Sequence, residues 1–416
     1  MRKRLLAAVT ALCMLLSGCA AEPMVTKQTE QTRITFSWWG NDKRTEYTIE
    51  GIELFEKLHP EIKVDVSYSE WTGYEARNRI QMVSQTEADV MQINFSWLPE
   101  FSPDGEGYYD LESVSEEVDL SDFDAVTLDY GRRGGVLNGI PIAMNAETVY
   151  VNKTLYDQYG LDIPETWDDL KAAAAVMSKD GVYPMSCADK AAWLYIIAYT
   201  EQLTGKPILR EDGNLNFSPN DLKIMLLFYK ELVESKVIPQ IEYYDRLNIQ
   251  NGTYAGTVAW VSDAVNYCGA AMDEGYEIVT APYTHSAETA SGVGWYAKPA
   301  TLYAISKNTQ HPKEAAMLLD FLLNDHDMAI LQSVEKGVPI SPSARNALDE
   351  EGLLSGLQYE ACLCMENCEN LSPIHAYLEN AAVYGAFFDA CNLVLYDKAT
   401  PEEAASQLYL QIHDPA

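Results

Sequence analysis

Tryptophans stand beside planar polar side chains at several points of the sequence, and each of these groups follows a short apolar stretch. An indole ring offers a flat face for stacking, while amide and guanidinium groups offer hydrogen bonds in one plane. This combination is typical of a preformed cleft that holds a small molecule. Trp38 and Trp39 come first, followed by Asn41 and Arg44. Because neighbours on a strand point to opposite faces, we expect one of the two tryptophans to line a cleft.

Further candidates lie where predicted strands end. Trp71 lies just beyond one predicted strand. A second predicted strand contains Gln92 near its end and is followed by Asn94 and Trp97. A sheet of parallel strands places its binding loops at these carboxyl ends. Packing in the core is the alternative role for each tryptophan. It is strongest for Trp193, which has the spacing of a helical core stripe.

Bond-breaking chemistry has little support in the sequence. The Gly-x-Ser-x-Gly, His-Glu-x-x-His and Walker motifs are absent, and the chain has only 6 His. A glycosidase needs two carboxyls about 5–10 Å apart, a distance that sequence alone does not give. Cys362, Cys364 and Cys368 lack the paired Cys-x2-Cys or nearby His of a zinc site. We therefore expect no enzyme activity, no metal and no cofactor.

Composition excludes one large class of partner. The 416 residues include 62 Asp+Glu against 29 Lys+Arg, a formal charge of −33, and no basic run follows residue 4. A nucleic-acid binder needs a basic face, so we expect no nucleic-acid partner. With 47% hydrophobic and 22% charged residues, the chain is typical of a folded globular protein. Its length favours two domains.

The first residues resemble an export signal. Residues 1–4 are basic, and residues 5–16 form an apolar run too short to span a bilayer. The sequence Leu16-Ser17-Gly18-Cys19 resembles the lipobox of bacterial lipoproteins, which predicts cleavage before Cys19 and attachment of lipid to its sulfur. Residues 1–18 are then a signal peptide and residues 19–32 a flexible tether, with the lipid as the only membrane anchor. An ordinary signal peptide with an incidental cysteine is the alternative.

Hydrophobic periodicity predicts alternating strands and helices. Such alternation indicates an α/β fold with a mostly parallel sheet. A second lobe is predicted to begin near residue 149. The predicted strands cover residues 33–38, 62–68, 89–93, 139–142, 148–151 and 301–306, and the predicted helices cover residues 45–58, 73–85, 167–178, 191–204, 221–235 and 311–323, with helical segments from 343 to 410.

Several of these segments together resemble the bacterial extracellular solute-binding proteins of family 1, the carbohydrate-capturing lipoproteins of ABC importers. No single motif is specific, but the ordered set covers residues 33 to about 345 behind a lipobox. The resemblance rests on Phe36-Ser-Trp-Trp-Gly40 with Arg44, Leu54-Phe-Glu-Lys-Leu-His-Pro-Glu-Ile-Lys-Val64, Ala88-Asp-Val-Met-Gln92 with Trp97, Asn138-Gly-Ile-Pro-Ile142, Tyr150-Val-Asn-Lys153, Pro164-Glu-Thr-Trp-Asp-Asp169, Lys298-Pro299, Ala304-Ile-Ser-Lys307, His311-Pro-Lys-Glu-Ala-Ala316, Phe321-Leu-Leu-Asn-Asp325 and Gly337-Val-Pro339.

The resemblance implies a two-lobe periplasmic-binding-protein fold of type II-like form, with the ligand cleft between lobes joined by crossover strands. Lobe 1 would comprise residues 33–147 and about 300–338, and lobe 2 residues 148–299 and about 339–416. The chain would leave lobe 1 near residues 145–150, return near 300 and cross again near 340. Closure of the cleft would present a monomeric protein to the permease subunits of an ABC transporter.

A sugar offers hydroxyls and flat C–H patches, which suit aromatic and planar polar side chains. Phe101-Ser-Pro-Asp-Gly105 and the first motif, Phe36-Ser-Trp-Trp-Gly40, are similar to a branch of the family that includes oligogalacturonide binders. In that branch an arginine is expected where Glu147 stands in this sequence. Because a carboxylate repels a uronate, a neutral oligosaccharide is favoured. Acidic and amino sugars remain alternatives, as does a non-sugar solute such as a peptide. The ligand-binding candidates are Trp38, Trp39, Asn41, Arg44, Trp71, Gln92, Asn94, Trp97, Asn145, Glu147, Trp193, Trp260, Asp263, Trp295 and Tyr296.

Overall fold

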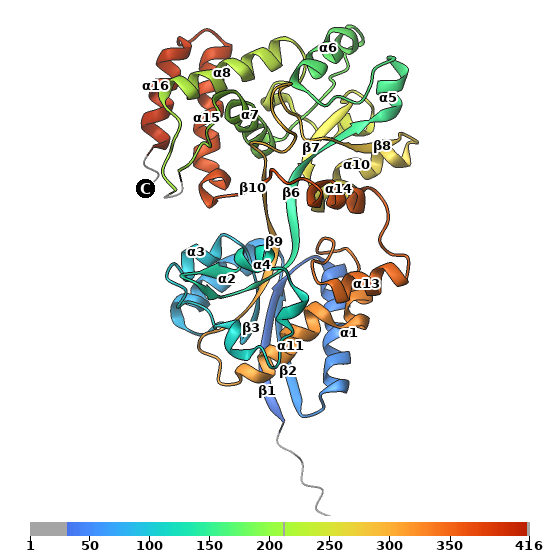
Figure 1. The fold of residues 1–416 in the computed structure, drawn as a ribbon, viewed down its shortest axis with the longest axis vertical. Coiled ribbons are helices and arrows are strands. Elements are labelled where there is room, and N and C mark those ends of the chain that lie inside the picture. Colours follow the sequence, from blue (N-terminus) through green and yellow to red (C-terminus); the bar gives the residue numbers. More distant parts are fainter. Residues whose placement is uncertain (1–30, 211–212, 414–416) are drawn as a thin grey trace, which may run out of the picture.

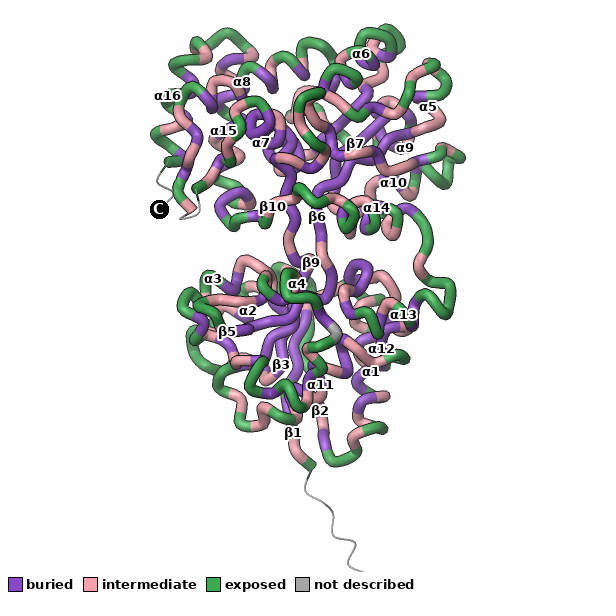
Figure 2. Tube along the Cα trace, in the orientation of Figure 1, coloured by how far each residue is buried: buried purple, intermediate pink, exposed green. Residues whose placement is uncertain are grey.

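The computed structural model describes residues 31–210 and 213–413. Figure 1 shows two α/β bodies, lobe 1 and lobe 2, placed one above the other along the long axis and joined by extended segments. Buried residues follow the strands of both lobes, while the outer helices carry the exposed ones (Figure 2). The predicted signal peptide, Cys19 and nearly all of the tether lie outside the described residues. Within those residues, no helix is both long and apolar enough to cross a membrane.

Lobe 1 is built on the parallel strands β2, β1 and β3, in that spatial order. The first helix starts where Asn41 accepts a hydrogen bond from the backbone N–H of Arg44 at 2.9 Å, which satisfies one free donor of the helix end. Its elements are β1 (Thr32–Trp39), α1 (Asp42–Leu58), β2 (Ile62–Ser69), α2 (Trp71–Ser84), β3 (Val90–Ile93), α3 (Trp97–Phe101), α4 (Ala125–Asp129), β4 (Arg132–Arg133), β5 (Val136–Leu137), α11 (Pro312–Asn324), α12 (His326–Gln332) and α13 (Pro342–Glu350).

Lobe 2 packs helices around two short strands. Capping boxes at Thr166 and Ser218 begin two of its helices. Its elements are α5 (Lys153–Gln158), α6 (Trp167–Met177), α7 (Asp189–Thr204), α8 (Pro219–Glu234), α9 (Leu247–Gln250), β7 (Gly256–Trp260), α10 (Ala264–Asp273), β8 (Ile278–Ala281), α14 (Leu357–Glu366), β10 (Ser372–Pro373), α15 (Ala381–Leu395) and α16 (Pro401–Ile412), with 3-10 turns η5 (Val261–Asp263) and η6 (Ala376–Glu379) near the junction.

Two long strands run from one lobe into the other. β6 (Ile140–Asn152) pairs with β9 (Tyr296–Ile305) through residues 140–146, and with β7 and β8 through residues 147–152. β9 in turn pairs with β3 of lobe 1. All of these pairings are antiparallel, so the sheet is mixed and the expectation of a mostly parallel sheet is wrong. The cause is that β6 leaves lobe 1 and β9 re-enters it in opposite directions.

The third connection lies later than expected. We expected the chain to cross near residue 340, but α13 packs against α11 and α12 of lobe 1. Ala344 and Ala347 bury their methyl groups against Ala329 of α12. The next helix, α14, packs on β6, β8 and α10 of lobe 2. The chain therefore crosses between α13 and α14, because small side chains hold the proline-initiated helix α13 on lobe 1.

Candidate functional site

The carboxyl ends of the lobe 1 strands face lobe 2. β1, β2 and β3 run from the far end of lobe 1 toward the junction, where they end at Trp39, Ser69 and Ile93 (Figure 1). Asn41 and Asn94 lie in the loops after β1 and β3, and Trp71 and Trp97 begin the helices α2 and α3 that follow β2 and β3. The structure therefore gathers at one edge several residues that the sequence singled out.

Three tryptophans and one tyrosine form a cluster on one face of this edge. Trp39 lies 5.0 Å from Trp71 and 6.1 Å from Trp97, measured between ring centroids, and Trp71 stacks on Trp97 at 5.8 Å. Tyr74 closes the cluster against Trp97 at 6.0 Å. Trp97 is 0% exposed, whereas Trp39 and Trp71 are half-buried. Trp97 is thus the support, and the other two indoles remain partly open to a ligand.

Trp38 points to the other face of the sheet, as the alternation of a strand requires. It is 0% exposed and stacked between Phe36 and Tyr68, each at 4.9 Å. Our expectation that one member of the Trp38–Trp39 pair faces the junction is consistent with this geometry. Trp38 itself packs in the core of lobe 1.

The polar candidates of lobe 1 mostly serve local structure. Arg44 donates from Nη2 to the backbone oxygen of Glu335 at 2.6 Å, which ties α1 to the segment after α12. Asn94 accepts from the backbone N–H and the hydroxyl of Ser96, at 3.0 and 2.9 Å. Gln92 is buried within β3. Of this group, only Asn41 is exposed at the edge.

Lobe 2 presents a charged edge centred on Trp260. Trp260 ends β7 directly opposite Glu147 of β6 and is half-buried. The ammonium groups of Lys190 and Lys298 lie 5.1 and 4.7 Å from the centre of its indole ring. Both lysines also donate to the same carboxylate oxygen, Oε1 of Glu379, at 3.0 and 2.5 Å. One carboxylate therefore holds two cations beside one aromatic ring.

Burial changes the ionisation of this edge. It raises the pKa of Glu147 to about 8, with Lys190 and Lys298 opposing the rise and Asp263 and Glu379 adding to it. Glu147 is 3% exposed, and its Oε2 has no hydrogen-bond partner in the described part of the chain. Burial also lowers the pKa of Lys298, whereas the two lysines outweigh burial at Glu379 and lower its pKa. Glu147 is thus mostly uncharged at neutral pH.

Asn145 positions the loop beyond Trp260. Its Nδ2 donates to the hydroxyl of Ser262 at 3.0 Å, and its Oδ1 accepts from the backbone N–H of Ser262 at 3.1 Å. Asp263 accepts from Asn266 at 3.2 Å and is half-buried. Asn145 lies on the crossover strand β6, and Asp263 ends η5 of lobe 2.

Three aromatic candidates of lobe 2 are core residues in this structure. Trp193 is 0% exposed, and its indole N–H donates to the carbonyl of Leu378 at 3.2 Å. The indole N–H of Trp295 donates to the carbonyl of Thr284, and the hydroxyl of Tyr296 donates to Glu201. The expectation that they line the cleft does not fit these contacts, because each polar group is already used inside the lobe.

Sequence reasoning missed Lys190, Lys298 and Glu379 as site residues. They lie on α7, β9 and η6, far apart in the chain, and only the folded topology brings them together. Lys298 belongs to a family-like motif, but no spacing linked it to the other two. An isolated charged residue carries no signal in a chain with 91 charged side chains.

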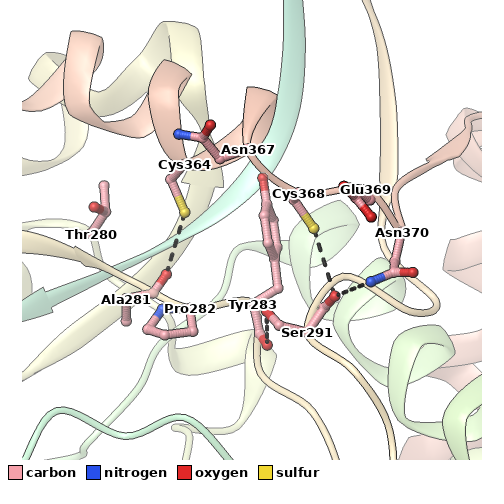
Figure 3. Close-up of a pocket in the computed structure, with 10 residues that line it drawn as sticks. All are labelled: Thr280, Ala281, Pro282, Tyr283, Ser291, Cys364, Asn367, Cys368, Glu369 and Asn370. Atoms are coloured by element: carbon pink, nitrogen blue, oxygen red, sulfur yellow. Dashed lines mark hydrogen bonds between the residues drawn. The ribbon is translucent and has the colours of Figure 1, made fainter.

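A separate pocket of about 580 Å³ lies in lobe 2 between the end of β8 and the end of α14 (Figure 3). Cys364 and Cys368 face it, with their sulfurs 3.9 and 3.7 Å from the carbonyls of Ala281 and Ser291. Cys362 turns instead toward Arg345 and Glu366. The six cysteines of the described residues are free thiols. None of the sequence-predicted ligand residues lines this pocket.

The chain matches one protein family and is similar to several known proteins. The model of the family described as bacterial extracellular solute-binding protein matches residues 41–329. A periplasmic oligogalacturonide-binding protein from Yersinia enterocolitica, solved with saturated digalacturonic acid, has a TM-score of 0.79 at 32% identity, over 92% of this chain and 98% of that one. A de novo designed esterase has a TM-score of 0.85 at 31% identity, over 92% and 98% of the two chains.

A curated relative matches over a shorter stretch. The arabinooligosaccharide-binding protein of Halalkalibacterium halodurans is 26% identical over 199 residues, which is 44% of this chain and 42% of that protein.

Proposed function

This chain belongs to the bacterial extracellular solute-binding proteins, and we propose that it captures an oligosaccharide by closing its lobes and delivers it to the permease of an ABC importer. The observation that carries the proposal is the pair of facing edges. Trp39 and Trp71 are partly open on lobe 1, and Trp260 with its polar neighbours is partly open on lobe 2. Stacking on rings and hydrogen bonds to planar groups together suit a sugar.

The ligand of this proposal is a neutral oligosaccharide. Repulsion of a uronate by Glu147 is weak support for a neutral ligand, because burial keeps that carboxyl mostly protonated near pH 7. The stronger support is Glu379, which already occupies both lysines beside Trp260. A neutral ligand leaves this ion cluster intact. The arabinooligosaccharide-binding relative is compatible with such a ligand.

An acidic sugar is the second candidate, because two lysines flank the one half-buried indole of lobe 2. A uronate carboxylate would compete with Glu379 for these lysines. The Yersinia protein, solved with a digalacturonic acid, supports this alternative. An amino sugar has less support, since its ammonium group would meet Lys190 and Lys298.

Calorimetric titration with neutral, acidic and amino oligosaccharides tests the proposal. We expect heat with a neutral oligosaccharide and no release of shorter products on prolonged incubation. Heat with uronates alone would favour the second candidate, and heat with peptides alone would contradict sugar capture. Released sugars would contradict the proposal that the protein binds without turnover. The designed esterase does not alter that proposal, since its activity was designed onto the chain.

We also propose that Cys19 carries lipid after removal of residues 1–18, and that the protein works as a monomer at the outer face of the cytoplasmic membrane. Because the chain crosses for the third time between α13 and α14, lobe 1 of this proposal comprises residues 33–147 and about 300–350. Lobe 2 comprises residues 148–299 and about 357–416. Labelled fatty acid should be incorporated by the wild type and not by Cys19→Ala. Equal incorporation by the two proteins would contradict the lipid anchor.

A further inference from the structure

Buried polar groups gather beneath the first turns of α1, on the face of the sheet opposite Trp39. Strand pairing places Trp38, Gln92 and Tyr303 in one row across β1, β3 and β9. Phe36 stacks on Trp38 and meets Tyr303 edge to face at 5.8 Å, so Trp38 and Tyr303 point to the same side. All three residues of the row are almost fully buried.

Two positively charged side chains, Lys336 and Arg44, act on Tyr303 at the end of this row. Lys336 is 3% exposed and donates from Nζ to the hydroxyl of Tyr303 at 2.7 Å. Its ammonium group lies between the rings of Tyr47 and Tyr303, 5.9 and 5.0 Å from their centres. Within residues 31–210 and 213–413, no carboxylate forms an ion pair with Lys336. Arg44 is the charged group that acts on Lys336 most strongly, and it is also positive.

Hydrogen-bond donors remain unused around these cations. The Nε of Arg44 and the indole N–H of Trp38 are buried, and neither has a partner in the described part of the chain. The amide oxygen of Gln92 is also unpartnered. An amide can turn by half a rotation and present its NH₂ group instead. The amino end of α1 adds partial positive charge. Donors and positive charge therefore predominate.

A buried positive charge without a counter-ion is costly, so the group either loses its proton or gains an anion. Burial, followed by Arg44, lowers the pKa of Lys336 to about 7, so the lysine is only partly charged at neutral pH. An anion would restore the charge and satisfy the unused donors together. A water molecule would satisfy the donors and leave the charge uncompensated.

We propose that Trp38, Arg44, Tyr303 and Lys336 bind a small monovalent anion, for which chloride is the probe. The site lies inside lobe 1, separate from the partly open tryptophans, and the proposal does not depend on the sugar. The anion would tie α1 and β9 to the segment that carries Glu335 and Lys336, which leads toward β6 through the bridge between Pro339 and Ala143. It would thus stabilise the junction of lobe 1 with a crossover strand.

Crystals of the wild-type protein soaked in bromide give the direct test. We expect an anomalous peak within hydrogen-bond distance of Lys336 Nζ and of Arg44 Nε or Trp38 Nε1. Density for water alone at this place, with no anomalous signal, would overturn the proposal. This measurement needs no variant and therefore does not depend on how a substitution folds.

Thermal unfolding in solution provides the second test. Sodium chloride is exchanged against sodium methanesulfonate at constant ionic strength, and the midpoint of the wild type should rise with chloride. Lys336→Met should weaken the apparent chloride affinity by roughly tenfold or more, as loss of a charged hydrogen bond implies. Lys206→Met is the matched control, because Lys206 already pairs with Asp221 at 2.6 Å. An equal chloride response in Lys336→Met and the wild type would overturn the proposal.

Discussion

Replacing Glu147 by glutamine should make the protein markedly more stable at alkaline pH. In the native state, burial raises the pKa of this carboxyl from 4.5 to about 8. The unfolded chain loses the proton near pH 4.5, while the native protein keeps it up to about pH 8. The native state therefore binds more protons than the unfolded state over this interval, and the wild-type stability falls as pH rises.

The size of the effect follows from the width of that interval. Each pH unit contributes about 1.4 kcal/mol, so the wild type should lose about 5 kcal/mol of unfolding free energy between pH 4.5 and pH 8 through Glu147 alone. Glutamine resembles the protonated acid and has no proton to lose. The two proteins should differ little near pH 4.5, and Glu147→Gln should exceed the wild type by up to about 5 kcal/mol at pH 9.

Urea unfolding of both proteins at pH 5, 7 and 9 measures this difference, because ionisations common to both cancel. Glu201→Gln is the matched control. Glu201 is a second buried glutamate, on α7 of lobe 2, and burial raises its pKa to about 7. The stability difference between Glu201→Gln and the wild type should therefore stop growing about one pH unit below the pH at which the difference for Glu147→Gln stops growing. A stability difference between Glu147→Gln and the wild type that stays constant from pH 5 to pH 9 would refute the reasoning, since the carboxyl would then ionise as in water.

Three further changes test other parts of the account. Trp260→Ala should weaken sugar binding by about 1–3 kcal/mol in calorimetry through loss of stacking area, whereas Ala at the exposed Tyr243 of the same lobe should change nothing. Glu379→Gln frees two lysines and should strengthen binding of an acidic sugar roughly tenfold relative to a neutral one. An unchanged ratio of the two affinities would contradict the interpretation that Glu379 occupies both lysines. Gly107→Ala should lower the free energy of unfolding measured in urea by more than about 2 kcal/mol, since its Cβ would overlap the backbone carbonyl oxygen of Phe101.

Local rules predicted the elements of this fold well. The helix expected at residues 167–178 is α6 (Trp167–Met177), because its first turn carries a capping box at Thr166. The expected strand at residues 62–68 is β2, which alternates in the sequence and pairs with β1 along its full length. These features depend on residues a few positions apart, and sequence periodicity reports them directly.

Long-range packing was harder to predict. α13 remains on lobe 1 because Ala344 and Ala347 fit against Ala329, and small residues leave no periodic signal that names their partner. The lysine pair beside Trp260 depends on the pairing of β6 with β7 and β9. Helical spacing left Trp193 as both a core candidate and a ligand candidate, and only the folded structure shows that its indole N–H donates to a carbonyl of η6. Each miss concerns a contact between segments that the sequence separates widely.

Small-angle X-ray scattering with and without a binding oligosaccharide tests the central proposal most directly. Capture between Trp39, Trp71 and Trp260 requires the two edges to approach one another, so the radius of gyration should fall when a saturating sugar is added. The same sugar should produce a smaller fall with Trp260→Ala at equal concentration. A sugar that binds in calorimetry and leaves the radius of gyration unchanged would contradict capture by lobe closure.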